Sequence, residues 1–356
     1  MASATRLTEI DLLRFFAAMA VLLFHYAFAG NNTGDMQLPI PDALEAAATY
    51  GYLGVDLFFL ISGFVIALSA QRGTPLRFLL DRLIRLYPAF LVAVLLTALV
   101  RTLWGSADDD ISIRNLLLNL SLFAGIFEDR LDLEFVDGVY WSLMVELQFY
   151  GLVLLALLLG LGRHLQPLML GWLAITLASD YLSLPGWLDR LLLLEWSPYF
   201  IAGALFHEVQ RRGLNPLRGV AIALCLYLSV RYAIWRLEFY NEFYNYEFEP
   251  MAVSGIVIGL YLLFMLLSSG ALRPLRHPWL IWLGGLTYPL YLLHQNIGYI
   301  TFRRFDALAA PIPLFWSLTA GMLLLALSVH LLVERGLGQR LRRAAHRRLT
   351  SPIDAA

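Results

Sequence analysis

The sequence predicts an all-α integral membrane protein, a polytopic bundle of about ten transmembrane helices with both termini in the cytoplasm. Composition is the first reason: 59% of the 356 residues are hydrophobic and only 15% are charged, whereas soluble domains carry about 25% charged residues. The second is a series of apolar runs close to the ~20 residues that a helix needs to cross a bilayer. The third is that arginine-rich connecting segments alternate along the chain with acidic ones.

The hydropathy of the chain predicts ten membrane spans. They are expected at residues 12–30, 50–70, 86–104, 138–160, 165–183, 191–208, 217–236, 251–269, 279–299 and 310–333. We expect residues 1–338 to form a single transmembrane domain and residues 339–356 to form a basic cytoplasmic tail. Such a tail is suited to anionic lipid headgroups.

The connecting segments predict the orientation in the membrane. Those on one side carry Arg72, Arg77, Arg82, Arg85, Arg211, Arg212, Arg273, Arg276 and the cluster from Arg335 to Arg348. Those on the other side carry Asp108, Asp109, Asp110, Glu128, Asp129, Asp132, Glu134, Asp137, Glu238, Glu242, Glu247 and Glu249. Basic loops are retained in the cytoplasm, so the arginine side is expected to be inside. We expect the protein in the inner (plasma) membrane of the cell.

The first span contains two ionisable residues, Arg14 and His25. Eleven residues are close to three helical turns, so both side chains are expected on nearly one face, ~16 Å apart along the axis. Charged groups inside a span usually face the bundle interior or a watery cavity. This stripe predicts a polar track into the protein. The alternative is that Arg14 reaches to the cytoplasmic surface and that His25 is a hydrogen-bonded interior residue.

The second and fourth spans also contain polar residues at membrane depth. Asp56 lies inside an apolar run, and Ser62 and Gly63 allow another helix to approach closely. The fourth span begins with Trp141 and Ser142 and continues to Glu146. The two acids line a cavity, or each pairs with an arginine to hold the bundle. Trp141 is equally suited to anchoring the helix at the interface.

Further candidates lie before the third span and inside the ninth. Arg82 and Arg85 are three residues apart, so they share a helix face and suit phosphate binding; ordinary cytoplasmic arginines are the alternative. Tyr288 and His294 flank Pro289, which frees a backbone carbonyl in mid-span. Here the alternatives are helix geometry for Tyr288 and packing for His294.

Two outer loops are expected to do more than connect spans. Residues 113–127 have apolar residues at helical spacing and are expected to lie along the membrane interface. Residues 237–249 interleave carboxylates with aromatic rings. This composition suits a rim that faces a glycan, and it suits an interfacial aromatic belt equally well.

Taken in order, these stretches resemble the acyltransferase-3 family of integral membrane acyltransferases. The resemblance runs from Asp11-Leu-Leu-Arg14 through His25 to the Val333-Glu334-Arg335 ending. Between these come Gly-Val-Asp56-Leu-Phe-Phe-Leu-Ile-Ser62-Gly, Arg82-x-x-Arg85 before Tyr87-Pro88, Trp141-Ser-x-x-x-Glu146 and Tyr288-Pro-Leu-Tyr-Leu-Leu-His294. Where the family often has a proline after the final Glu-Arg, this chain has Gly336. That difference is expected to loosen only the end of the last helix.

The resemblance implies transfer of an acyl group, often acetyl, from cytoplasmic acyl-CoA to a hydroxyl, usually of a cell-surface or exported carbohydrate. It implies His25 as the catalytic base, with Glu146 assisting, because imidazole titrates near neutral pH. Acyl-CoA binding is expected from Arg14, Arg82 and Arg85. The residues expected on the acceptor side or lining the cavity are Asp56, Ser62, Trp141, Ser142, Tyr288 and His294. We expect no metal, no permanently bound cofactor and no nucleic-acid partner; donor, acceptor and lipid bilayer are the expected partners.

Alternatives remain open at this level. Acyl transfer is either direct or through an acyl-histidine. The acceptor is a carbohydrate or a small secreted product such as an antibiotic. A proton-coupled transporter or flippase would also contain intramembrane ionisable residues, but the arginine pair on the inner face and the absence of inverted repeats favour the enzyme. The sequence leaves open the acyl length, the acylated position and the oligomeric state.

Overall fold

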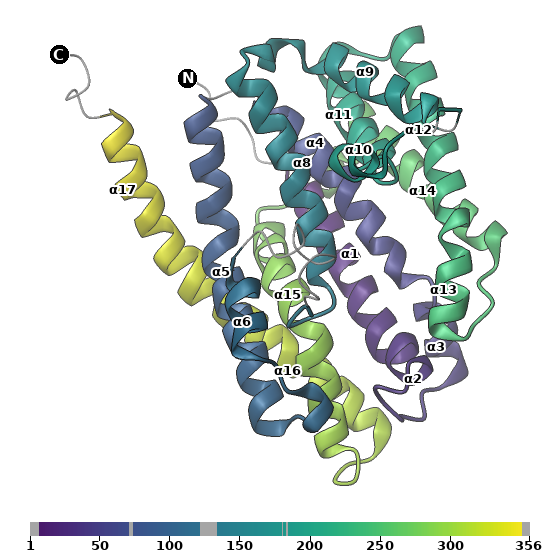
Figure 1. Ribbon diagram of the computed structural model, residues 1–356, viewed down its shortest axis with the longest axis vertical. Helices are drawn as coiled ribbons and strands as arrows, with labels where there is room; N and C mark the ends of the chain where they lie inside the picture. Colours follow the sequence, from purple (N-terminus) through teal and green to yellow (C-terminus); the bar gives the residue numbers. More distant parts are fainter. Residues whose placement is uncertain (1–6, 71–73, 122–133, 180, 183, 351–356) are drawn as a thin grey trace. The chain divides into compact units, whose positions relative to one another are not determined.

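The computed structural model describes residues 7–70, 74–121, 134–179, 181–182 and 184–350, and all of the regular structure in these ranges is helical (Figure 1). The predicted all-α class is confirmed. The chain divides into two compact units. Unit 1 comprises Met1–Arg72 with Val145–Gly284, and unit 2 comprises Gly73–Met144 with Gly285–Ala356. Arg72, Glu128, Asp129, Asp132 and residues 122–127 of the predicted interfacial helix lie outside the described ranges.

Unit 1 begins with a helix that changes its geometry at His25. Its elements are α1 (Thr8–Phe24), the π-helix η1 (His25–Ala29), α2 (Gly30–Asn32), α3 (Asp42–Ala48), η2 (Gly51–Leu53), α4 (Gly54–Ala70), most of α8 (Tyr140–Leu158), η4 (Leu161–His164), α9 (Leu165–Ala178), α10 (Gly186–Leu192), α11 (Ser197–Arg212), α12 (Pro216–Trp235), α13 (Leu237–Tyr244), α14 (Pro250–Ser269) and η5 (Arg273–Leu275).

The core of unit 1 is the crossing of α4 and α11. Helix α11 packs on α4, α9, α12 and α14, and its residues Ser197–Val209 are buried. Glycines permit the crossing, because a Cβ at Gly63 would lie 2.1 Å from the Phe200 carbonyl oxygen and one at Gly203 would lie 2.1 Å from that of Leu60. The expectation that Gly63 allows close helix approach is therefore confirmed.

Unit 2 contains α5 (Pro75–Trp104), η3 (Ala107–Asp109), α6 (Ile113–Leu120), the beginning of α8, most of α15 (Leu280–Phe305), α16 (Pro311–Val329), the π-helix η6 (His330–Gly338) and α17 (Gln339–Thr350). Helix α5 packs on α6, η6 and α17. It begins at Pro75, with the Thr74 hydroxyl accepting from the Arg77 N–H at 3.3 Å. Proline suits a first helical turn, where its missing N–H has no partner to lose.

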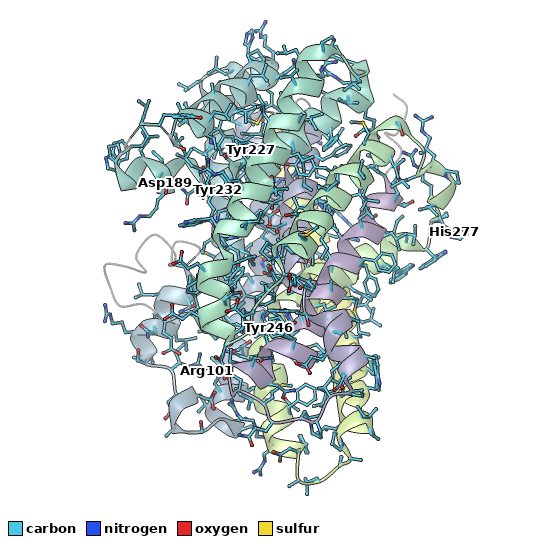
Figure 2. All side chains as sticks on the ribbon, turned by 90° about the vertical axis from the view of Figure 1, so that its right-hand side faces the viewer. Arg101, Asp189, Tyr227, Tyr232, Tyr246 and His277 are labelled. Carbon is cyan, nitrogen blue, oxygen red and sulfur yellow. The ribbon has the colours of Figure 1, made fainter. Side chains whose placement is uncertain are left out.

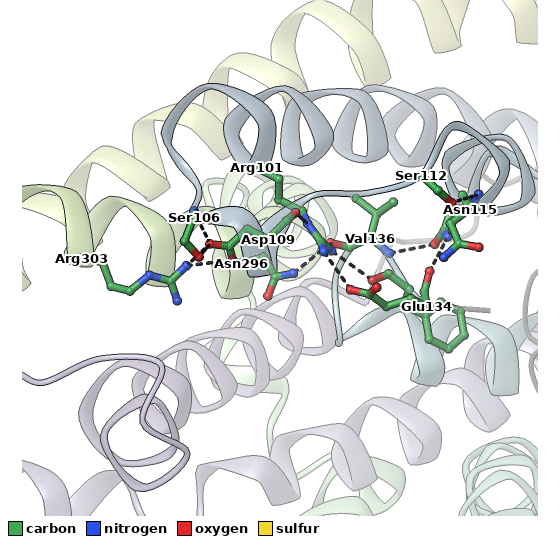
Figure 3. Close-up of polar contacts among 11 residues, drawn as sticks. Arg101, Ser106, Asp109, Ser112, Asn115, Glu134, Val136, Asn296 and Arg303 are labelled. Carbon is green, nitrogen blue, oxygen red and sulfur yellow. Dashed lines mark hydrogen bonds and ion pairs between the residues drawn. The ribbon is translucent and has the colours of Figure 1, made fainter. Parts of the chain in front are cut away.

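A buried arginine holds the segments on either side of the undescribed residues 122–133 (Figure 3). Arg101 donates to the carbonyl of Asp109 at 2.6 Å, to that of Val136 at 3.0 Å and to the Glu134 carboxylate at 2.8 Å. The Asn296 side chain also donates to the Val136 carbonyl, at 2.9 Å. These bonds fix the chain just before α8.

Two predicted loops are in fact partly helical. Residues 71–85 were expected to connect spans, but from Pro75 on they are the first turns of α5, so Arg77, Arg82 and Arg85 lie on a helix. Residues 237–249 were likewise expected as a loop, yet Leu237–Tyr244 form α13, which follows α12 with one residue between them. In both places the loop prediction relied on polar residues, whose side chains are accommodated on exposed helix faces.

Seven helical segments of the described chain are long and apolar enough to cross a membrane. They are Thr8–Asn32, Asp42–Ala70, Pro75–Trp104, Tyr140–Leu158, Pro216–Tyr244, Pro250–Ser269 and Pro311–Ala344. The predicted count of ten and the cytoplasmic termini are not confirmed. The other three predicted spans correspond to α9, α11 and α15. Helices α9 and α11 have 14 and 16 residues, fewer than the ~20 of a straightforward span.

Candidate active site

His25 lies at the first position of the π-helix η1, where its side chain is 9% exposed. Its Nδ1 lies 2.8 Å from the Val21 carbonyl oxygen. Because a carbonyl only accepts, Nδ1 carries the proton in this contact, and Nε2 is the basic nitrogen of the neutral ring. The ring of Phe24 meets the imidazole edge-on at 5.3 Å. The site therefore has a histidine in a fixed tautomer, the form that a general base requires.

Arg14 is half-buried in α1, eleven residues before His25. Helix α1 is α-helical up to Phe24, so the expected alignment of the two residues and their ~16 Å separation both hold. Closer to the start of the helix, buried Glu9 accepts two bonds from Nε of Arg276 at 2.8 Å and a third from its terminal nitrogen at 2.6 Å. A buried carboxylate is tolerated when it is paired in this way.

Ser62 and Glu146 are brought together in unit 1. The Ser62 hydroxyl donates to Oε1 of Glu146 at 2.6 Å, and the Tyr150 hydroxyl donates to the same oxygen. Tyr150 lies one turn after Glu146 on α8, and its hydroxyl is 3.4 Å from that of Ser62. Glu146 is half-buried. The carboxylate of Glu146 is thus held by two hydroxyl groups, not by the arginine that the alternative prediction required.

Asp56 is paired with an arginine, as one of the two readings of the sequence allowed. Its carboxylate lies 3.4 Å from Arg236, the residue that caps α12. Arg236 also binds Glu195 at 3.1 Å and lies over the ring of Trp196, 4.1 Å from its centroid. Both Asp56 and Arg236 are buried.

In unit 2, Arg82 and Arg85 lie on one face of α5, as expected from their spacing. Both are half-buried, and the Arg82 guanidinium lies 5.5 Å from the centroid of the Phe78 ring. The neighbouring Asp81 is shared between Arg77, at 3.9 Å, and Arg342 of α17, at 3.6 Å. The face therefore presents two guanidinium groups from successive turns.

The remaining candidates surround the start of α8 and the middle of α15. The Ser142 and Tyr291 hydroxyls are 2.6 Å apart. Tyr288 donates to the carbonyl of Leu86, the residue that follows Arg85 on α5, at 3.2 Å. His294 is fully buried, and its Nδ1 lies 2.9 Å from the Tyr291 carbonyl oxygen.

The contact of His294 with a carbonyl of its own helix supports the packing interpretation of this residue, whereas the Tyr288 hydroxyl joins α15 to α5. Trp141 is half-buried near the beginning of α8. Ser142 is buried, and its hydroxyl partner, Tyr291, is a residue that sequence reasoning quoted but gave no role.

Five residues were given no site role from the sequence, and each is bonded to another residue of its own unit. They are Tyr150, Glu195, Arg236, Arg276 and Tyr291. Arg236 left a signal: it lies at the end of an apolar run, five residues after Arg231, and a buried cation requires an acid.

The comparisons with known proteins agree with this architecture. A family model described as an acyltransferase domain, that of the acyltransferase-3 family, matches residues 7–331. The exopolysaccharide production protein ExoZ of Rhizobium meliloti (strain 1021) is 27% identical over 314 residues, which cover 86% of this chain and 94% of ExoZ. The acyltransferase MdmB of Streptomyces mycarofaciens is 26% identical over 336 residues, covering 81% of this chain and 78% of MdmB.

A third relative, BcsY of Komagataeibacter xylinus, is 34% identical over 173 residues, 45% of this chain and 39% of BcsY. No solved structure matches the chain significantly. The family model spans nearly the whole chain, and the motif residues of both units fall within it, apart from the final Val333-Glu334-Arg335. The chain therefore belongs to the acyltransferase-3 family and is a multi-pass membrane acyltransferase.

Proposed function

We propose that this acyltransferase takes an acyl group, acetyl in the simplest case, from cytoplasmic acyl-CoA and transfers it to a hydroxyl of an extracytoplasmic carbohydrate. We place it in the inner (plasma) membrane. The relative ExoZ carries the name of an exopolysaccharide production protein, which favours a polysaccharide over a small secreted product as acceptor.

The observation that carries the proposal is the fixed tautomer of His25 in the π-helix η1. With Nδ1–H bonded to the Val21 carbonyl, Nε2 is oriented to take the proton of an acceptor hydroxyl. The acceptor oxygen attacks the thioester carbonyl, an O–C bond forms, and the C–S bond breaks. The CoA sulfur then takes the proton back from the imidazolium, so that the products are an ester and free CoA.

The donor is assigned to the arginines. CoA carries phosphates, and guanidinium groups bind phosphates through charge-assisted hydrogen bonds. Arg82 and Arg85, on one face of α5, are assigned to the nucleotide phosphates, and Arg14 to a more distal part of CoA. The ~16 Å between Arg14 and His25 excludes contact of both residues with the same reacting carbon.

Glu146 is assigned to the acceptor side, with Ser62 and Tyr150 fixing its carboxylate. A carboxylate that is held by two hydroxyl donors is oriented before a substrate arrives, which lowers the cost of binding. Asp56, Ser142, Trp141, Tyr288 and His294 are retained as residues that line or support the site.

The chemical step is tested with purified protein in lipid nanodiscs, acetyl-CoA and a thiol reagent that reports free CoA. Cys225 is buried, so the reagent is expected to report CoA alone. We expect His25→Gln to lose on the order of 10²-fold or more in rate, the usual contribution of a general base. His277→Gln, at an exposed histidine before α15 (Figure 2), is the matched control and should keep the wild-type rate.

Folding of both histidine variants is checked by thermal unfolding. A folded His25→Gln protein that releases CoA within tenfold of the wild-type rate would remove His25 as the base. Mass spectrometry of surface glycans from cells with and without the gene then identifies the acceptor through a missing acyl mass. The transporter alternative would be favoured if the glycans are unchanged, no CoA is released, and protons move across vesicles that contain the protein.

The donor assignment is tested by the affinity for CoA. Charge-assisted hydrogen bonds contribute about 1.5–3 kcal/mol, so Arg82→Gln and Arg85→Gln are each expected to raise the dissociation constant about tenfold or more. Arg77→Gln is the matched control, because Arg77 is exposed on the same helix. If all three variants bind CoA as the wild type does, the phosphates bind elsewhere.

A further inference from the structure

Unit 1 contains a buried charged group that the chemical step does not use. We name it the Arg236 cluster, and its members are Asp56, Glu195, Trp196, Arg236 and Tyr52, the last of which interacts electrostatically with Asp56 and Arg236. Arg236 is 7% exposed, and it faces the carboxylates of Asp56 and Glu195. The two acids outnumber the one cation, so the cluster carries a surplus negative charge when all three groups are ionised.

Two polar atoms of the cluster lack a hydrogen-bond partner in the described part of the chain. They are Nε of Arg236 and the hydroxyl of Tyr52, and both are buried. An unmatched buried donor costs about 1–3 kcal/mol, so such atoms in a native protein call for an explanation. The ring of Tyr52 lies 5.0 Å from that of Tyr240 and 5.4 Å from that of Phe248, which keeps the hydroxyl in place.

The cluster adjoins the turn that carries His25. Tyr52 packs on Phe24, the residue before His25, with ring centroids 5.4 Å apart. Helix α1 ends at Phe24, α4 and α11 begin at Gly54 and Ser197, and α12 ends at Trp235. The cluster and His25 therefore lie at the same ends of these helices.

At the opposite ends of these helices, Arg211 and Arg212 lie in the last turn of α11, and Arg276 is paired with Glu9 at the beginning of α1. Under the positive-inside rule those ends are cytoplasmic, so the Arg236 cluster belongs to the extracytoplasmic half. That is the half from which the proposed acceptor arrives. Glu195, whose side chain is 30% exposed, is the member of the cluster closest to solvent.

We propose that the Arg236 cluster binds the acceptor and selects a neutral, hydroxyl-rich sugar over an acidic one; this inference rests on the proposed function. A sugar hydroxyl both donates and accepts, so it satisfies the unmatched Arg236 and Tyr52 donors together with the carboxylates. Aromatic faces nearby suit the apolar side of a sugar ring. The surplus negative charge disfavours carboxylated sugars, and it equally disfavours the phosphates of CoA.

The test measures binding directly, with cellotetraose as the neutral probe and tetragalacturonic acid as the acidic one, using the full-length protein in nanodiscs. The wild type is expected to bind cellotetraose at least tenfold more tightly than the acidic probe. Tyr52→Phe removes only the unmatched hydroxyl, so cellotetraose should bind about threefold to tenfold more weakly. Tyr227→Phe, at an exposed tyrosine of α12 outside residues 237–249 (Figure 2), is the control and should bind as the wild type does.

Thermal unfolding distinguishes loss of sugar binding from loss of stability in the Tyr52→Phe protein. Because the Tyr52 hydroxyl has no partner without the ligand, Tyr52→Phe should unfold at the wild-type temperature or above it. Glu195→Gln removes one charge and is expected to reduce the preference for the neutral probe about tenfold, for charges roughly 10 Å apart at an effective dielectric constant of about 20. Asp42→Asn, at an exposed acid of α3 outside residues 237–249, should leave the preference unchanged.

Equal binding of the two probes by the wild type, or unchanged cellotetraose binding in Tyr52→Phe, overturns the inference. If CoA release and acylated glycans are both observed while Tyr52→Phe binds normally, the inference fails and the proposed function stands. If binding depends on Tyr52 but no acyl transfer occurs, the sugar site stands and the proposed function fails.

Discussion

The crossing of α4 and α11 makes Gly63→Ala the sharpest test of how the fold supports the site. A Cβ at position 63 would lie 2.1 Å from the Phe200 carbonyl oxygen and 2.9 Å from the Phe200 Cα, whereas ordinary contacts begin at 3.4 Å. The obstacle is backbone rather than the end of a flexible side chain, so the helices have to separate by about 1 Å. A gap of that size removes a quarter to a half of the dispersion attraction across the interface.

The expected cost combines two opposing effects. Overpacking of this kind costs about 1–3 kcal/mol, and alanine returns up to ~1 kcal/mol through its higher helix propensity. Gly259→Ala in α14 isolates the second effect, because a Cβ there has no neighbour within 4 Å. The helix-propensity gain is common to both variants, so we expect their unfolding free energies to differ by the overpacking cost of about 1–3 kcal/mol, with Gly63→Ala the less stable.

The assay is thermal unfolding of both variants in the same nanodiscs, followed by the rate of CoA release. Gly63 follows Ser62, whose hydroxyl is 2.6 Å from Glu146, so separation of the helices should also disturb that contact and lower the rate. If Gly63→Ala unfolds at or above the temperature of Gly259→Ala, the close crossing does not contribute to stability as argued.

Two further predictions concern unit 2. Arg101→Ala removes the hydrogen bonds to the Asp109 and Val136 carbonyls and to the Glu134 carboxylate, and should destabilise the protein by about 3 kcal/mol or more. Arg304→Ala, at an exposed arginine of α15, should cost less than ~0.5 kcal/mol in thermal unfolding. Burial tends to raise the pKa of Asp109, but bonds from Ser106 and the Arg303 guanidinium at 2.7 Å outweigh it and hold the pKa below its usual range. The stabilisation from this lowered pKa is present above pH ~4 and is lost as the pH falls below it, so Asp109→Asn should flatten the acid limb of a stability–pH curve; an unchanged limb would contradict this assignment.

Sequence patterns predicted which faces of helices carry the site, because periodicity reports orientation within one helix. The shared face of Arg82 and Arg85 and the close approach at Gly63 were predicted in this way, and both are found. The predicted helix boundaries were wrong where the chain is polar. Residues 75–85 and 237–244 were predicted as loops because of their polar residues, but both stretches are helical.

Partners far apart in the sequence could not be predicted, since one sequence carries no information on which distant residue meets another. Glu9 meets Arg276 across 267 positions, and Asp56 meets Arg236 across 180. Each acid lies in or beside an apolar run, so the sequence could predict that it needs a cationic partner. Which arginine supplies it depends on how α1, α4 and α12 pack.

The π-helical segment at His25 could not be predicted either, because prediction of helices from the sequence assumes 3.6 residues per turn. The carbonyl of His25 accepts from the Gly30 N–H, five residues on, so the turn is wider than in an α-helix. In this turn the Phe24 and Phe28 rings stack at 5.5 Å, and Phe28 meets Tyr246 at 4.9 Å. No residue type marks such a turn in advance.

A π-helical segment is rare and persists where side-chain packing holds it, frequently at functional sites. A second one, η6, covers the end of the last span, where Gly336 was expected only to loosen the helix. In η6 the His330 Nδ1 and a Glu334 carboxylate oxygen are 2.5 Å apart, and the ring of His330 lies against Gly285, where a Cβ would approach it within 2.4 Å. Each described π-segment thus begins at a histidine whose Nδ1 is bonded, and each contains a residue of the family's motif series. The irregular turn therefore marks the proposed catalytic base, whereas the residues assigned to the donor and to the acceptor lie on regular helices.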